Sequence, residues 1–419
     1  MTATTTNSPE ATDESASEAP AARPDEGLTY LVGETIFLRG LEIGDAKASA
    51  AWRPSPFPIS AESLEEQLKK EIPKQSDKRV ERLIACRRDD GRPVGSAWID
   101  ESDQLESTLA LHADPNLGNV GAQMQAEMLG LLAPWLATEH HRPVVRLITD
   151  AELEPVTARA GELGMRRAVQ LRDAAWREGR LRDRLFLEYL NPAWIARVGD
   201  PGEGIADAGE PVREVRAPAP RRDHTSAFSV PKNAVIASER LALRPMEADD
   251  AETIARLYRK EPDASFGLSR FPFSAVMLSD WIGEIGEDAT PSELEFAVVL
   301  RESGDLIGEN GLYDIDWFSR TAETGSWIYR PQHRGGGYGT EAKHLLLEYA
   351  FERLGLHSVW SWVTSLNVRS QAALRKQGYR DAGRLNWTGF GTDGFTSARM
   401  FDLLASEWRA ARDGEMSPD

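Results

Sequence analysis

The strongest constraint on the fold is that this chain contains one sequence pattern twice. The segments GETIFLRGLEIGDA, residues 33–46, and SERLALRPMEADDA, residues 238–251, share six residues at one constant offset of about 200 positions. The shared residues are Glu34, Leu38, Arg39, Glu42, Asp45 and Ala46 in the first segment and Glu239, Leu243, Arg244, Glu247, Asp250 and Ala251 in the second. Solenoids repeat every ~20–50 residues, so this spacing instead predicts two copies of one domain.

Further parallels define the content of each copy. LIACRRDDGRPVGSAWID, residues 83–100, and FAVVLRESGDLIGENGLYD, residues 296–314, both read as a strand, a glycine turn and a second strand. In the second copy a stripe of apolar residues at spacings of three and four predicts a helix over 338–354. The element order predicts an α+β fold, with a mixed, mostly antiparallel sheet flanked by helices in each copy.

Composition sets the borders of the two copies. Residues 1–27 are acidic and lack both a basic start and an apolar run, so they predict a disordered tail and not a secretory signal. Residues 199–233 are rich in Pro, Gly, Ala and charge, which is typical of a linker. The folded copies are therefore expected at 28–198 and 234–412, with a short tail at 413–419.

The charge balance narrows the possible partners. The chain of 419 residues has a net charge of −18, which argues against binding nucleic acid or an anionic membrane and favours a cationic or amine substrate. It has a single cysteine, Cys86, and its histidines show no ligand spacing, so we predict neither a disulfide within the chain nor a metal site. His344 is expected to be exposed. We predict a cytoplasmic protein without membrane spans.

A glycine-rich turn in YRPQHRGGGYGTEA, residues 329–342, carries the clearest functional signal. A Walker loop would need a lysine after the last glycine, and a dinucleotide fingerprint would need glycine where Thr340 stands. The pattern Arg/Gln-x-x-Gly-x-Gly/Ala is satisfied by Arg334, Gly337 and Gly339. Glycines before a helix let an anion approach its free N–H groups. A simple tight turn is the alternative, but four glycines cost up to ~1 kcal/mol each, so we favour a pyrophosphate cradle.

Three motifs together resemble the Gcn5-related N-acetyltransferase (GNAT) superfamily, in particular its RimJ/RimL type. They are ERLALRPMEADDA, AETGSWIYRPQHRGGGYGTEA and NVRSQAALRKQGY, and the resemblance covers nearly all of 235–410. It implies an enzyme that moves the acetyl group of acetyl-CoA directly to a primary amine, on a protein N-terminus or a small molecule. A non-catalytic acyl-CoA-binding or interaction protein, or a transferase with another acyl donor, is the alternative.

The resemblance also implies roles for particular residues. The coenzyme would be held by the end of one strand, the glycine turn and a later asparagine, namely Ile328, Arg330, Arg334, Gly335, Gly337, Tyr338, Gly339, Thr340 and Asn367. Glu323 would be the general base, with Glu309 as the second choice. Ser370 would protonate the thiolate, with Tyr379 as another candidate acid. The alternatives are a solvated or ion-paired Glu323, helix capping by Asn367 and Ser370, and a Tyr379 packed in the core.

The first copy departs from this pattern. Aligning Pro115 with Pro331 puts NLGNVGAQM, residues 116–124, on the glycine turn, and Gly118, Asn119 and Gln123 replace Arg334, Gly335 and Gly339. Leu153 and Val156 replace Asn367 and Ser370, and no carboxylate matches Glu323. We therefore predict a degenerate GNAT-like domain that packs against the catalytic one as an intramolecular pseudo-dimer. The acceptor amine is expected between residues 257–274 and the strand ends.

Overall fold

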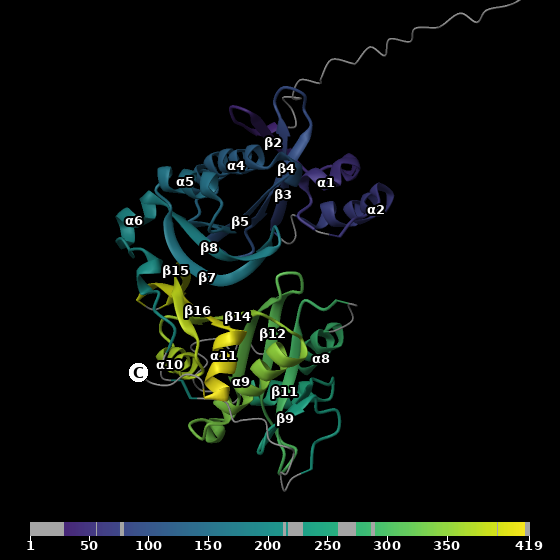
Figure 1. Ribbon diagram of the computed structural model, residues 1–419, viewed down its shortest axis with the longest axis vertical. Coiled ribbons are helices and arrows are strands. Elements are labelled where there is room, and N and C mark those ends of the chain that lie inside the picture. The colour runs from purple at the N-terminus through teal and green to yellow at the C-terminus, as the bar shows by residue number, and fades with distance from the viewer. Residues whose placement is uncertain are drawn as a thin grey trace, which may run out of the picture.

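The computed structural model describes residues 29–55, 57–75, 79–212, 215–216, 229–258, 274–285, 290–391 and 393–414 (Figure 1). The elements of the first half are β1 (Thr29–Val32), β2 (Ile36–Gly40), η1 (Ile43–Ala48), α1 (Ser49–Trp52), α2 (Ala61–Glu71), η2 (Ile72–Lys74), β3 (Val80–Arg87), β4 (Pro93–Asp100), β5 (Glu106–Ala113), η3 (Pro115–Leu117), α4 (Asn119–Thr138), β6 (Val144–Asp150), α5 (Glu154–Glu162), β7 (Arg166–Arg177), β8 (Arg180–Leu190) and α6 (Pro192–Val198).

The second half repeats this order after a short connecting 3-10 turn. Its elements are η4 (Gly204–Asp207), β9 (Ile236–Ala237), β10 (Leu241–Pro245), α7 (Asp250–Tyr258), α8 (Ala275–Glu284), β11 (Leu294–Leu300), β12 (Leu306–Asp316), β13 (Thr321–Ile328), η7 (Pro331–His333), α9 (Tyr338–Glu348), η8 (Tyr349–Arg353), β14 (Ser358–Thr364), α10 (Val368–Lys376), β15 (Arg380–Gly391), β16 (Gly394–Leu404) and α11 (Ala405–Asp413). The predicted helix over 338–354 is α9 continued by the π-helical turn η8.

The described strands form one sheet that runs through both halves. Its order is β1-β2-β3-β4-β5-β6-β8-β7-β15-β16-β14-β13-β12-β11-β10-β9, so the second half mirrors the first. Neighbouring strands are antiparallel except for the parallel pairs β5–β6 and β13–β14. The predicted α+β class with a mostly antiparallel sheet is confirmed.

Each half buries both faces of its part of the sheet under helices. In the second half Val298 and Leu312 face α9, whereas Ala297 and Val299 face α7 and α8, as the alternation of side chains along a strand requires. In the first half the cluster around Leu83 and Ala85 packs under α4, and the cluster around Ile84 and Cys86 packs under α1 and α2. Hence α1–α2 and α7–α8 cover equivalent faces; α1, α2 and α8 lie along one side of the molecule in Figure 1.

The two halves meet at β7 and β15 through contacts related by an approximate two-fold axis. The two strands pair at Val169 and Gly383, which occupy equivalent positions in their hairpins. The backbone N–H of Arg172 donates to the buried Asp402 at 3.0 Å. The equivalent N–H of Asn386 donates to the buried Glu188 at 2.9 Å. The glycine is required at this point, because a Cβ on Gly383 would stand 2.2 Å from the Ala168 carbonyl oxygen.

The described part of the connecting segment packs onto the second half. A Cβ on Gly204 would meet the Arg384 carbonyl oxygen at 1.7 Å, and Asp207 forms a 2.5 Å ion pair with Arg384. Farther along, the Arg216 N–H donates to the Lys376 carbonyl at the end of α10. The chain between the halves thus contacts the second half at both of these places. Among the described residues, no helix is long and apolar enough to cross a lipid bilayer.

Candidate active site

The site begins where the parallel strands β13 and β14 separate. They pair only from Thr321 to Glu323, opposite residues 358–360, although β13 continues for five more residues. Just beyond the last pair, two hydroxyl groups bridge the strands: Thr324 Oγ1 donates to the Trp360 carbonyl at 3.1 Å, and Ser361 Oγ donates to the Thr324 carbonyl at 2.9 Å. Beyond this point β14 no longer pairs with β13, so an extended ligand could pair with this part of the strand.

The glycine turn at the N-terminus of α9 has the backbone geometry expected of an anion-binding cradle. Gly335 and Gly337 both have φ +83°, a left-handed conformation that glycine adopts without strain. Gly337 is the N-cap of α9, and no side chain caps the helix. The first N–H groups of α9 therefore point toward the turn without an intrahelical partner, together with the positive end of the helix dipole.

Two arginines that the sequence analysis missed complete this cradle. Two guanidinium nitrogens of Arg216 and one of Arg240 lie 3.5–3.6 Å from the position that a Cβ would take on Gly337. Arg240 is fixed by Glu341, with Nε 2.7 Å from Oε2, and stacks on the ring of Tyr338 with its guanidinium carbon 4.3 Å from the centroid. Local positive charge is thus concentrated here on a strongly acidic chain, which suits a pyrophosphate.

Arg334 contacts the end of β13 in this structure, and its contact with a phosphate stays a prediction. Its Nε and Nη2 donate to the Ile328 carbonyl at 3.0 and 2.8 Å, and Nη2 also donates to the Tyr329 carbonyl at 3.2 Å. It therefore braces the end of β13 against the turn. Arg330, between β13 and η7, buries its Nε without a hydrogen-bond partner, which leaves a donor for a ligand at this end of the strand. Ile328 also contacts the turn, since its Cγ1 lies 3.5 Å from a Cβ placed on Gly339.

Glu323 is the last residue of β13 that pairs with β14, and its carboxyl group has an unusual environment. Burial raises its pKa to about 7, and the charge of Asp314 acts in the same direction. The charge of Lys343 and a hydrogen bond from Trp362 oppose this shift, because each lowers the pKa of Glu323. A carboxylate with a pKa near neutrality suits a general base at physiological pH.

Lys343 on α9 is a second unusual group that sequence analysis missed. Its side chain is 2% exposed, and burial lowers the pKa of its ammonium group to about 7 against the opposing effect of Glu323. Its Nζ lies 5.8 Å from the centroid of the Tyr379 ring. Tyr379 itself is fully buried, and its hydroxyl lies 2.8 Å from Thr324 Oγ1. Lys343 and Tyr379 thus lie beneath the point where the two strands separate, and burial raises the pKa of the Tyr379 hydroxyl.

Three carboxylates surround Tyr313 on the sheet face that α7 and α8 cover. The Tyr313 hydroxyl donates to Glu295, and the charges of Glu295, Glu309 and Glu323 raise the pKa of Tyr313 in addition to the effect of burial. Burial, then the charge of Glu309, raises the pKa of Glu295. Glu309, the second-choice base, accepts a hydrogen bond from Tyr329. The raised pKa values show that a positive charge placed on this face would favour the ionised forms of these carboxyls.

Asn367 and Ser370 lie at the N-terminus of α10. Asn367 is the N-cap, and its Oδ1 accepts a 3.1 Å hydrogen bond from the Ser370 N–H. The helix begins shortly after the end of β14. Because β13 and β14 are parallel, both residues lie on the side of the sheet where these two strands end. Of the segment 257–274 that was expected to hold the acceptor, residues 259–273 lie outside the described residues. Within the described ranges, no group of three or more His, Cys, Asp or Glu side chains could hold a metal ion.

His344 is buried, contrary to expectation. It is 9% exposed, because the segment at Arg216 covers this face of α9. His344 Nε2 lies 3.1 Å from the Arg216 carbonyl oxygen, and the Trp408 indole N–H donates to its Nδ1 at 3.4 Å. Burial lowers the pKa of His344 to about 4, so it is neutral at pH 7 and donates to the Arg216 carbonyl through Nε2.

The equivalent region of the first half has a different geometry. Strands β5 and β6 stay paired over five positions, to Ala110 and Ile148. The register places Thr108 where the second half has Glu323. A single residue, Gly118, separates η3 from α4, whereas residues 334–337 separate η7 from α9. The widened turn and the early separation of strands therefore occur in the second half and not in this one.

Known proteins match part of the chain. Residues 240–380 match the family model of the acetyltransferase (GNAT) domain. The N-acetyltransferase p20 of Bacillus licheniformis, whose activity is uncharacterised, is 28% identical over 173 residues, which are 41% of this chain and 96% of p20. The putative ribosomal N-acetyltransferase YdaF of Bacillus subtilis is 26% identical over 184 residues, which are 42% of this chain and 97% of YdaF.

Solved structures are similar over a comparable share of the chain. The spermidine N-acetyltransferase of Vibrio cholerae in complex with CoA and spermine is 24% identical, with a TM-score of 0.37, and the match covers 41% of this chain and 99% of that one. A structure described as a probable acetyltransferase is 26% identical with a TM-score of 0.38, over 42% and 98% of the two chains.

Proposed function

Through residues 240–380 this chain belongs to the GNAT acetyltransferases and is an N-acetyltransferase, and we propose that it moves the acetyl group of acetyl-CoA to the primary amine of a cationic acceptor. The observation that carries this proposal is that three features lie together where β13 and β14 separate. They are the uncapped, arginine-lined turn before α9, the separation of β13 from β14, and Glu323 at the base of that separation.

The residues around the turn fit acetyl-CoA. The free N–H groups of α9, with Arg216 and Arg240, would bind the pyrophosphate, and the unpaired edge of β13 would accept the amides of the pantetheine arm. Acetyl-CoA supplies the acetyl group as a thioester that a neutral amine can attack. The main chain near Ile328 would stabilise the negative charge that develops on the carbonyl oxygen.

Glu323 supplies the proton acceptor that the amine requires. A primary amine with a pKa near ~10.4 is almost fully protonated at pH 7, which costs ~4–5 kcal/mol to reverse. Glu323, with its pKa of about 7, can accept that proton when ionised, directly or through a water molecule. Ser370, whose N–H is bound by Asn367 at the start of α10, would return a proton to the leaving thiolate.

The acceptor class follows from the charge of the facing surface. Glu295, Glu309 and Glu323 lie on the α7–α8 face around Tyr313, and an acceptor with more than one positive charge would favour their ionised forms and be attracted to them. Such acceptors include polyamines and basic N-terminal peptides. A neutral amine of equal size would lose this attraction.

For the first half we propose a structural role in an intramolecular pseudo-dimer. This is supported by the two-fold contacts across β7 and β15 and by the paired strands β5 and β6, which leave no opening equivalent to that in the second half. The described connecting segment supports the same arrangement, since it supplies Arg216 to the cradle.

The function is tested with purified protein, acetyl-CoA and a panel of amines, with release of the CoA thiol as the readout. Spermidine, putrescine and a lysine-rich peptide should be acetylated at higher kcat/KM than butylamine, which carries one charge only. Arg216→Gln should raise KM for acetyl-CoA and leave kcat nearly unchanged, and Arg92→Gln, an exposed arginine of the first half, serves as control. Acetyl-CoA binding without turnover on any amine would favour a non-catalytic binding protein, and better turnover of butylamine would refute the cationic acceptor.

A further inference from the structure

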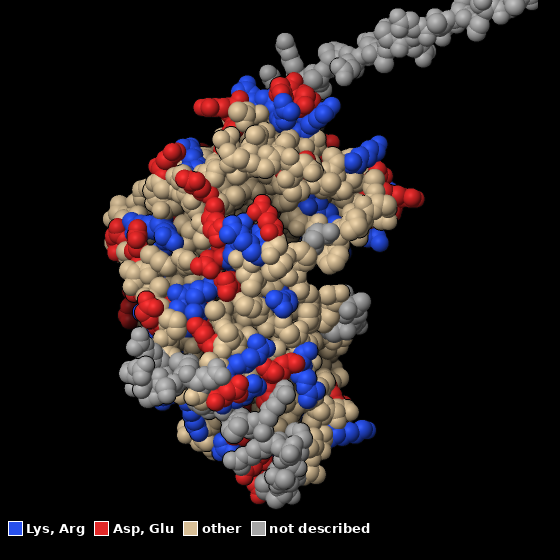
Figure 2. Space-filling model, viewed as in Figure 1, with Lys and Arg blue, Asp and Glu red and all other residues tan. Residues whose placement is uncertain are grey.

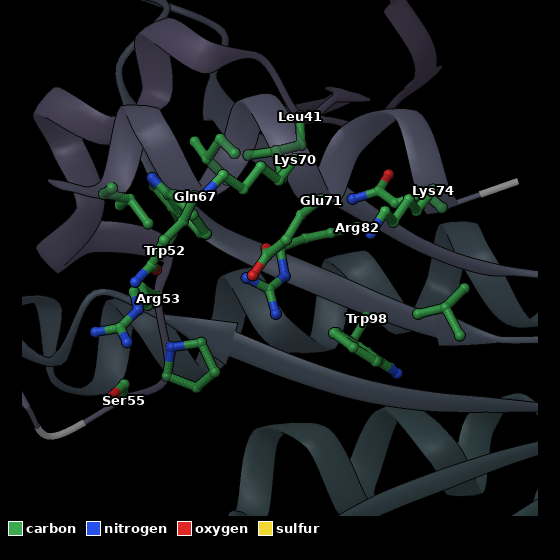
Figure 3. A pocket seen from close by; sticks show the side chains of 15 residues that line it. Leu41, Trp52, Arg53, Ser55, Gln67, Lys70, Glu71, Lys74, Arg82 and Trp98 are labelled. Atoms are coloured by element: carbon green, nitrogen blue, oxygen red, sulfur yellow. The ribbon is translucent and has the colours of Figure 1, made fainter. Parts of the chain in front are cut away.

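The first half contains a cavity of about 500 Å³ between α1, α2 and the strands β3 and β4 (Figure 3). Its wall is apolar at Leu41, Leu64, Leu68 and Val80, and Trp52, Arg82 and Trp98 form its polar and aromatic part. The volume lies within the ~300–1,000 Å³ that is usual for small-molecule sites. The cavity is separate from the candidate active site, which lies in the second half.

Arg82 is the central group of this cavity. Its guanidinium carbon lies 5.4 Å from the centroid of the Trp52 ring and 5.0 Å from that of Trp98, and the side chain lies between the two indoles in Figure 3. Among the described residues, no carboxylate forms an ion pair with Arg82. Glu71, which also lines the cavity, acts on it only through its more distant charge.

A half-buried guanidinium without a counterion is costly. Burial lowers the pKa of Arg82, since the low-dielectric surroundings disfavour its charged form, and the charge of Arg53 acts in the same direction. Arginine nevertheless stays protonated in proteins, so the cost falls on the stability of the fold. An anion entering the cavity would relieve it through charge-assisted hydrogen bonds.

Charged residues at the rim of the cavity also favour an anionic ligand. Arg53, Lys70 and Lys74 line the cavity together with Arg82, against the single carboxylate of Glu71. The aromatic surface is accessible as well, because Trp98 is 39% exposed while Trp52 is fully buried. The cavity therefore offers a cationic end and a flat apolar wall to the same ligand.

The register of the strands shows that this arrangement differs from the acceptor face of the second half. Arg82 pairs with Trp98 across β3 and β4, and the equivalent pair across β11 and β12 is Glu295 with Gly311. The equivalence is close, since both hairpins also contain a register shift at the matching place. At one position of the common fold the first half thus has a basic residue and the second an acidic one, and the first half places an indole where the second has no side chain.

We propose that this cavity is a binding site for a small organic anion, with its carboxylate or phosphate on Arg82 and its flat apolar part on Trp98. The cavity is lined by residues of α1 and α2, which lie along one side of the molecule in Figure 1, and on that side Figure 2 shows a hollow between the halves. The ligand is distinct in charge from the cationic acceptor proposed for the second half. The inference stands on the cavity alone and does not depend on the acetyltransferase activity.

The test is calorimetric titration of the full chain with benzoate, phenyl phosphate, inorganic phosphate and the neutral benzamide. We expect one site per chain for benzoate or phenyl phosphate, and the stronger of the two identifies the anionic group. Benzamide should not bind, and inorganic phosphate should bind more weakly than phenyl phosphate because it lacks the apolar part. Absence of binding by both aromatic anions, or equal binding of benzamide, overturns the proposal.

Variants locate the site. Arg82→Met should weaken anion binding by about tenfold or more, the value of a charge-assisted hydrogen bond. Lys69→Met is the matched control, because it removes one positive charge from α2 at a side chain that is 50% exposed and paired with Glu66. If Arg82→Met does not fold, Arg53→Met at the rim must weaken binding by itself. Unchanged affinity in the folded Arg82→Met variant, or in Arg53→Met in its place, overturns the proposal.

Discussion

Replacing Lys343 with methionine is expected to stabilise the protein at neutral pH. The lysine is almost fully buried, and its pKa falls from 10.5 to about 7 in the folded state. Between these values the unfolded chain binds a proton that the folded chain has released, so the stability of the wild type rises with pH across this window. Methionine has a similar shape and does not titrate.

The size of the effect follows from the pKa difference. At 1.36 kcal/mol per unit, the lysine costs ~4 kcal/mol of unfolding free energy at pH 7 and ~2 kcal/mol at pH 9. Lys343→Met should therefore be more stable than the wild type at pH 7, and its advantage should fall by about half at pH 9. Urea denaturation at both pH values measures this difference.

The pH dependence separates titration from repacking. A gain that comes only from better packing of methionine would be the same at pH 7 and pH 9. Lys69→Met, at an exposed position of α2, should change stability little at either pH. A Lys343→Met protein that is less stable than the wild type at pH 7, or whose advantage does not decline with pH, would refute the reasoning.

The same variant should change the kinetics. The charge of Lys343 lowers the pKa of Glu323, so its removal raises that pKa above about 7 and leaves less of the base ionised at pH 7. The acid limb of the kcat/KM profile should move to higher pH, with activity restored near pH 9. An acid limb that coincides with that of the wild type would show that Lys343 does not act on the catalytic base.

Three further predictions test the proposed site and the contact between the halves. Glu323→Gln should reduce turnover roughly 10²–10⁴-fold with acetyl-CoA affinity retained, and the rise of rate with pH through about 7, as the carboxylate ionises, should disappear; an unchanged pH–rate profile would exclude Glu323 as the base. Gly337→Val should abolish acetyl-CoA binding, since the position has φ +83° and borders the free N–H groups, whereas Gly118→Val in the first half should leave one site per chain by calorimetry. Arg172→Met should lower the unfolding free energy by ~1–3 kcal/mol, because the fully buried Asp402 loses one of its two arginine partners and keeps Arg380; an unchanged unfolding free energy in urea denaturation would contradict this estimate.

The local features of the site could be read from the sequence, and the long-range ones could not. The glycine turn was predictable because its conformation depends on residues 335–339 themselves, and the repeat was sufficient to predict an α+β fold. Arg216 could not be assigned, since it lies in a segment with the composition of a linker and reaches the turn only through packing on α9 and α10. The same packing buries His344, which the helical pattern alone places at the surface.

Lys343 is a second residue whose environment could not be predicted from the sequence. It follows Ala342 in the apolar stripe of α9, and a lysine there reads as solvated at the border of the stripe. Its burial depends on the ring of Tyr379, which arrives from the start of β15. The pKa of Glu323 depends in turn on this lysine, so the electrostatics of the site arise from elements that only the folded chain brings together.

The two-fold contacts across β7 and β15 have a consequence for how the protein can evolve. In a homodimer both sides of such an interface come from one gene and must carry the same residue at equivalent positions. Here one side has Arg172 against Asp402 and the other has Asn386 against Glu188. Because both sides belong to one polypeptide, their association does not weaken on dilution, and each copy is free to change its contacts and its ligand independently of the other.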